Sequence, residues 1–177
     1  MTMRFPAILA AAAFACQPTL ASAQDTACLT SKQAGSLASY ALPSVISGAT
    51  KRCSTSLSDK SYLKSSGSAL AKRYSVRKDE NWPAAKSAFL AMSKGKDGAD
   101  KVFSQLPDDS LKEMVDVVIE GLVTQEIPVE ECSKIDNFVR VLSPLPPENT
   151  AELVVLLVGL APAAKAKKPG KLSICEV

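Results

Sequence analysis

The chain has 177 residues, with 21 lysines and arginines against 18 aspartates and glutamates, and no histidine. Its length suits one domain of ordinary size. The absence of histidine excludes Ser-His-Asp and Cys-His catalytic units, histidine metal ligands and an imidazole acid or base at neutral pH. Aromatic residues make up 5% of the chain and the formal net charge is +3, so neither base stacking nor charge indicates a nucleic-acid partner.

The first 23 residues have the pattern of a cleaved export signal. Arg4 is the only charged residue before Asp25, and an alanine-rich apolar stretch over residues 5–15 follows it. An Ala-Ser-Ala motif ending at Ala23 predicts cleavage before Gln24. The apolar stretch is shorter than the roughly 20 residues that a membrane-spanning helix needs. We therefore expect a periplasmic or secreted mature chain that begins at Gln24 and has no transmembrane span.

A lipoprotein signal with Cys16 as the lipid acceptor is the alternative interpretation of this leader. Residues 13–15 (Ala-Phe-Ala) match such a site poorly, because it usually carries leucine and small residues. We therefore interpret Cys16 as part of the removed leader.

The mature chain predicts helices and no strands. Thr30-x-x-Gln33 has the form of a capping box, and apolar residues at helical spacing extend over residues 34–49. The apolar spacing continues unbroken through Pro43, which argues for one kinked helix. Proline lacks an amide donor, which argues for a stop and restart with Pro43 as the first residue of the second part, and we favour the restart. Residues 54–68 contain seven serines and predict a polar connection with a short helical turn.

The remaining helices are predicted from apolar spacing and boundary residues. Three are expected before residue 107: one that ends near Val76, one entered at residues 81–83 after a charged loop at 77–80, and a short one over 100–106. Three more are expected to begin at Pro107-Asp108, after Pro128, and at Asn149-x-x-Glu152. The last is apolar on nearly all sides over residues 153–158, which predicts a central position in the bundle.

The expected fold is all-α: a single compact bundle of about six or seven short helices, stabilised by disulfides. It extends over residues 24–164, and residues 165–177 form a lysine-rich tail anchored by Cys175.

Four cysteines remain after removal of the leader, and an even number in an exported chain indicates two disulfides. No two of them lie within five residues of each other, unlike the close pairs of structural zinc sites, and no Cys-x-x-Cys pair supports a catalytic thiol. We expect neither metal nor cofactor. Sequential pairing is favoured, because an exported chain is oxidised as its cysteines emerge: Cys28 with Cys53, and Cys132 with Cys175.

The sequential pairing carries a geometric condition. A straight helix from Thr30 to Lys51 would be about 30 Å long, whereas the Cα atoms of a disulfide lie within about 7 Å. Pairing Cys28 with Cys53 therefore requires a chain reversal, at Pro43 or near Gly48. One continuous helix would make this pairing wrong.

Two patterns could carry chemistry. Ser-x-x-Lys occurs at Ser61, Ser75 and Ser93 and has the spacing of the nucleophile motif of penicillin-interacting enzymes. The companion Ser-Asp-Asn and Lys-Thr-Gly motifs are absent, so we interpret the three matches as solvated helix surface. Carboxylates that could act as acid and base or bind a cation lie on one helical face, which we interpret as water-facing: Glu113, Asp116 and Glu120, with Asp108 and Asp109 above them. We predict no catalytic residue.

Charge is segregated along the chain. Residues 24–101 carry a net +7, residues 102–164 a net −8 and the tail a net +3. Such asymmetry can mark a basic surface for an anionic envelope component. The alternative, which we favour, is that the two halves fold against each other and their charges partly compensate. The candidate binding surface comprises Lys72, Arg73, Arg77 and Lys78 with Trp82, although a tryptophan at a helix start more often packs into the core.

We expect a non-enzymatic exported protein that acts through its surface, by contacts with an unknown protein or with an anionic component of the envelope. One alternative is a binding module for a small apolar ligand next to the helix over residues 153–161, which a cavity above about 300 Å³ would favour. Another is a periplasmic immunity or inhibitor protein, whose signature would be an exposed acidic face at Glu113, Asp116 and Glu120.

Overall fold

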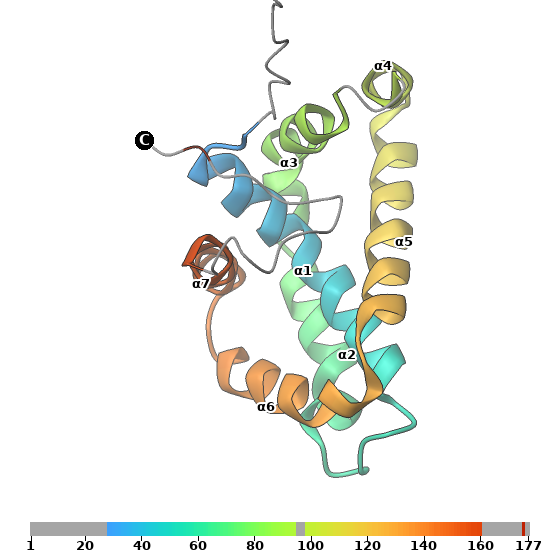
Figure 1. Ribbon diagram of the computed structural model, residues 1–177, viewed down its shortest axis with the longest axis vertical. Coiled ribbons are helices and arrows are strands. Elements are labelled where there is room, and N and C mark those ends of the chain that lie inside the picture. The colour runs from blue at the N-terminus through green and yellow to red at the C-terminus, as the bar shows by residue number, and fades with distance from the viewer. Residues whose placement is uncertain (1–27, 95–97, 161–174, 176–177) are drawn as a thin grey trace, which may run out of the picture.

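The computed structural model describes residues 28–94, 98–160 and 175. Within these residues the chain forms seven α-helices and no strand longer than a single bridge, which confirms the all-α prediction (Figure 1). The predicted leader and nearly all of the lysine-rich tail lie outside the described residues. The elements are α1 (Ser31–Cys53), α2 (Tyr62–Ser75), α3 (Lys78–Ser93), α4 (Ala99–Ser104), α5 (Asp108–Glu126), the 3₁₀ turn η1 (Val129–Glu131), α6 (Cys132–Leu142) and α7 (Pro147–Leu160).

Helix α1 is one uninterrupted helix, so the predicted restart at Pro43 is wrong. It begins with the predicted capping box: the Gln33 amide donates to Thr30 Oγ1 at 3.2 Å, and the Thr30 amide donates to Gln33 Oε1 at 3.0 Å. Pro43 lies inside the helix and is buried. Its neighbours Leu42 and Ile46 are buried in one core cluster, and this packing on both sides of the proline offsets the lost hydrogen bond.

The disulfides join Cys28 to Cys175 and Cys53 to Cys132, with Cα–Cα distances of 5.1 and 5.5 Å. The predicted sequential pairing is therefore wrong. Its physical reason is the length of α1: a helix of 23 residues is about 35 Å long, so its two ends cannot share a disulfide. Each end of α1 is instead fastened to a segment from the second half of the chain.

Helix α1 occupies the centre of the bundle. It packs against α2, α3, α5 and α7, and Figure 1 shows α5 and α7 on either side of it. The predicted central position of α7 is therefore wrong. Leu156 and Leu157 of α7 are 56% and 47% exposed, because α7 buries one side against α1 and leaves the other side open.

Three helices begin earlier than predicted. Helix α2 begins at Tyr62, so residues 62–68 of the polar connection predicted over residues 54–68 belong to this helix, where Leu63 and Gly67 are buried. The charged loop expected at residues 77–80 is the first turn of α3, where Asp79 and Glu80 lie at the positive end of the helix dipole. Helix α7 begins at Pro147 rather than at Asn149, which agrees with the preference of proline for the first helical position.

Gly48 lets α1 and α5 approach closely. A Cβ atom at this position would lie 2.7 Å from the carbonyl oxygen of Glu120 and 2.9 Å from Cβ of Val123, both on α5. A backbone oxygen cannot move without its helix, so any side chain at residue 48 would push α5 away from α1.

We expect Gly48→Ala to lower the free energy of unfolding by about 1–3 kcal/mol, because the added methyl group overpacks this contact. Gly35→Ala is the matched control in the same helix: its Cβ would meet nothing within 4 Å, so the protein should gain up to about 1 kcal/mol. Urea denaturation of both variants measures the difference. Equal stabilities would contradict the close approach of α1 and α5.

Candidate functional site

An apolar pocket of about 150 Å³ lies between α1, α2, α6 and α7, next to the end of α5. Among the described residues that line it, none is charged: Leu42, Val45, Ile46, Ala49, Leu70, Tyr74, Ile127, Ile135, Phe138, Val139, Leu142, Thr150 and Val154. The side chain of Phe138 is about half exposed, so the pocket reaches the surface at α6.

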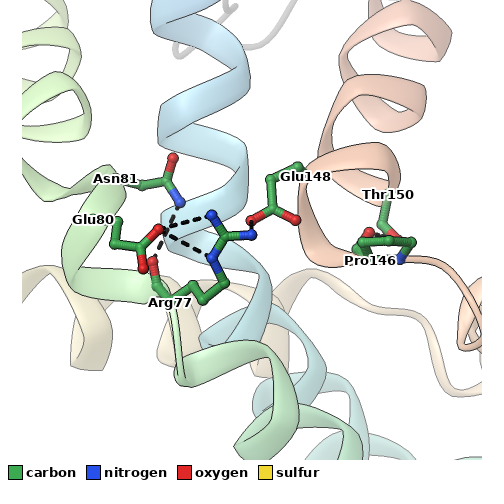
Figure 2. Close-up of polar contacts among 6 residues, drawn as sticks. All are labelled: Arg77, Glu80, Asn81, Pro146, Glu148 and Thr150. Atoms are coloured by element: carbon green, nitrogen blue, oxygen red, sulfur yellow. Dashed lines mark hydrogen bonds and ion pairs between the residues drawn. The ribbon is translucent and has the colours of Figure 1, made fainter.

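The two hydroxyl groups in the lining are already engaged within the protein. Tyr74 Oη donates to the carbonyl oxygen of Leu145 at 2.9 Å and lies 3.1 Å from Thr150 Oγ1. Thr150 Oγ1 in turn donates to the carbonyl oxygen of Pro146 at 3.1 Å (Figure 2). Since these hydroxyls have internal partners, the pocket is suited to a group that makes no hydrogen bonds of its own.

The volume of the pocket limits its occupant. It is half of the roughly 300 Å³ at which ordinary ligand sites begin, so this pocket does not favour the alternative of a small-molecule binding module. Apolar cavities of about 150 Å³ are known to stay dry and to accept a benzene molecule. One aromatic ring or one branched aliphatic side chain therefore fits.

The pocket is framed by fixed contacts between α6 and the first two helices. The disulfide between Cys53 and Cys132 joins the end of α1 to the start of α6, and both cysteines are fully buried. Asp136 of α6, itself 9% exposed, accepts a hydrogen bond of 2.6 Å from the backbone amide of Leu63 in the first turn of α2. The pocket wall is thus held covalently and by a buried charged hydrogen bond.

Asp136 takes over the capping of α2, a role that the sequence analysis missed. The N-cap residue, Ser61, makes no capping hydrogen bond with its side chain, so the carboxylate from α6 satisfies an amide at the positive end of the helix instead. One signal was available. Asp136 is a polar residue on the otherwise apolar face of α6 that carries Ile135 and Val139, and such a residue usually has a buried partner.

Trp82 lies in the core and is 4% exposed. It packs against Tyr40 with the ring centroids 4.9 Å apart. Lys78 Nζ lies 4.3 Å from the centre of the Tyr40 ring and forms an ion pair with Asp116. Burial and the charges of Asp116 and Asp79 raise the pKa of Tyr40 well above its usual value. Of the five candidate surface residues, Trp82 and Lys78 thus serve internal packing.

Two other candidate surface residues, Arg73 and Arg77, contact the segment over α6 and α7. Arg77 forms two hydrogen bonds to Glu80 and an ion pair of 2.9 Å with Glu148 of α7 (Figure 2). The guanidinium group of Arg73 donates to the carbonyl oxygen of Ser143, and Lys72 is exposed. The structure therefore does not gather the four basic residues into one patch with the buried Trp82, and the role of these five residues in binding stays a prediction.

The serines of the Ser-x-x-Lys motifs mostly bond within their own helices. Ser75 and Ser93 donate to the carbonyl oxygens of Lys72 and Phe89, and Lys64 pairs with Asp59 at 2.7 Å. Lys96, in the third motif, lies outside the described residues.

Ion pairs join the basic first half of the chain to the acidic second half. Lys86 pairs with Asp108 at 2.6 Å, and four further pairs cross between the halves: Lys51 with Glu120, Lys78 with Asp116, Asp79 with Lys112, and Arg77 with Glu148. These contacts support partial compensation of the two opposite charges. They also correct the water-facing assignment of Asp116 and Glu120, which turn towards lysines of α3 and α1, whereas Glu113 is exposed.

Within residues 28–94, 98–160 and 175, no group of three or more cysteine, aspartate and glutamate side chains is placed to hold a metal ion. No helix in this part of the chain combines the length and the apolar character needed to cross a bilayer.

The ion pairs between lysines and carboxylates make the free energy of unfolding depend on pH. Hydrogen bonds from Lys86, Lys112 and Lys51 lower the pKa values of Asp108, Asp79 and Glu120. Because the folded-state pKa is the lower one, these pairs stabilise the fold above the unfolded-state values of about 4 and lose that effect as the pH falls through the folded-state values.

We therefore expect Lys51→Met/Lys86→Met/Lys112→Met to be less stable than the wild type at pH 7, and the two urea midpoints to converge or cross as the pH falls towards about 2. Urea denaturation across this range measures both curves. Two parallel curves would contradict a contribution of these ion pairs to stability.

Comparison with known proteins adds no independent indication of function. No family model, no curated protein and no solved structure matches this chain.

Proposed function

We propose that this chain is an exported, non-enzymatic binding protein that receives one apolar side chain of a partner protein in the pocket between α1, α2, α6 and α7. The single observation that carries the proposal is this uncharged pocket of about 150 Å³. The signal pattern of residues 1–23 and the two disulfides support export to an oxidising compartment.

The size and chemistry of the pocket favour a side chain over a free small molecule. The volume suits one ring or one branched aliphatic group, and the engaged hydroxyls of Tyr74 and Thr150 leave no polar group to orient a larger ligand. In protein interfaces, a few apolar side chains inserted into such pockets supply most of the binding energy.

The surface beside the pocket continues its apolar character. Phe138 and Val141 of α6 are 47% and 63% exposed, and Phe138 also lines the pocket. A partner side chain in the pocket would therefore be surrounded by further apolar contact. Such a ring of contacts excludes water from the central anchor and strengthens it.

The frame of the pocket supports binding without rearrangement. Cys53–Cys132 and the hydrogen bond from Leu63 to Asp136 hold α6 in place before any partner arrives. A preformed pocket lowers the ordering cost of association.

A pocket-filling variant tests the proposal. We expect Val154→Phe to place its ring in the pocket and to weaken retention of a partner protein at least tenfold, whereas Val76→Phe, at an exposed position between α2 and α3, retains the partner. The measurement is affinity capture of the mature, oxidised protein from an envelope extract at low and high salt, followed by mass spectrometry. The contact is apolar, so retention by the wild type should survive high salt.

Cooperative urea unfolding of both variants, with midpoints at or above that of the wild type, controls for the fold. Equal retention of the same partner by the wild type and by folded Val154→Phe would contradict the proposal. A partner that is released by salt alone would contradict it as well, since an apolar anchor is not screened by ions.

A further inference from the structure

Helix α5 presents a second apolar surface, away from the pocket. It lies at the edge of the bundle in Figure 1, where it packs along α1. Val117, Val118 and Leu122 are 67%, 49% and 54% exposed. Residues four positions apart are neighbours on a helix, so Val118 lies beside Leu122 and Val117 beside Gly121. These four residues are called the outer face of α5.

Nothing in the described part of the protein requires a glycine at position 121, in the middle of the outer face. A Cβ atom there would meet nothing within 4 Å, whereas at Gly48 and Gly67 it would clash with a neighbouring helix. Glycine in a helix interior is less favourable than alanine, so an unused glycine is a cost to the fold. A second helix that crosses the outer face could approach closely at Gly121, because glycine has no side chain to hold the two backbones apart.

The charge beside the outer face indicates the chemistry of that helix. Helix α5 contains six carboxylates and one lysine, Lys112, which pairs with Asp79. Asp116 and Glu120 pair with lysines of α3 and α1, but Asp109 and Glu113 are exposed. A second copy of this chain that docked through the same face would bring the same carboxylates against each other, and an anionic lipid surface would be repelled. A segment with basic flanks is the complementary partner.

We propose that the outer face of α5 is a docking surface for a basic amphipathic helix of a partner protein. The apolar side of that helix covers Val117, Val118 and Leu122, its backbone passes close to Gly121, and its lysines or arginines lie near Asp109 and Glu113. This surface is independent of the pocket, so the proposal does not rest on the proposed function.

A fluorescent model peptide tests the docking surface on the mature, oxidised protein. The probe is a helical peptide of about five turns with a leucine and alanine stripe flanked by lysines, and the control peptide carries glutamates in place of the lysines. Fluorescence anisotropy should detect binding of the lysine peptide that weakens as salt rises, and at least tenfold weaker binding of the glutamate peptide.

Variants separate docking from folding. Gly121→Leu and Glu113→Lys should each weaken binding of the lysine peptide at least tenfold, whereas Gly35→Leu, at another open glycine, should leave it unchanged. Gly121→Ala should raise the melting temperature by about 3 °C while it weakens binding, since the glycine serves the partner and not the fold.

Four outcomes would overturn the proposal: no binding of the lysine peptide at millimolar concentration, equal binding of the two peptides, full binding by Gly121→Leu, or a dimer in sedimentation that Gly121→Leu abolishes. Attachment to vesicles of anionic lipid that Gly121→Leu abolishes would overturn it too, because the surface would then serve a membrane.

Discussion

The continuity of α1 is the constraint on which the remainder of the structure depends. Its 23 residues separate Cys28 from Cys53 by far more than a disulfide can reach, so both cysteines must find partners in the second half of the chain. The two cross-links close loops of 147 and 79 residues, which in the chain-entropy description stabilise the fold by about 4–5 kcal/mol each. Helices α2, α3, α5 and α7 then pack around α1.

Charge reinforces this arrangement. The acidic second half lies against the basic first half, and lysines of α1 and α3 face carboxylates of α5. Surface ion pairs are individually worth little, so these contacts contribute to the packing of α5 mainly as a group. The buried contact between Asp136 and Leu63 works differently, because a charged acceptor without its amide would be costly in the interior. It fixes the position of α6 relative to α2 and thereby the shape of the pocket.

Local signals in the sequence predicted local structure well. The capping box at Thr30, the apolar spacing of α1 and the start of α5 at Asp108 all depend on neighbouring residues, and the structure confirms them. Helices α2, α3 and α7 nevertheless begin earlier than their local patterns predict, and the larger errors concern tertiary packing. Whether a helix continues through Pro43 depends on what covers Leu42 and Ile46, and α7 is peripheral because α1 already occupies the centre. The pocket lies between four helices, so no local pattern could have predicted it.

A rigid frame with an apolar pocket on one side and an apolar helix face on another suits a protein that acts by binding. Both proposed surfaces require the order of helices around an uninterrupted α1. Digestion of the alkylated, unreduced protein, followed by mass spectrometry of the linked peptides, tests that order most directly. Peptides that join Cys28 to Cys175 and Cys53 to Cys132 are the expected result. Peptides that join Cys28 to Cys53 would contradict it, because α1 would then have to fold back on itself.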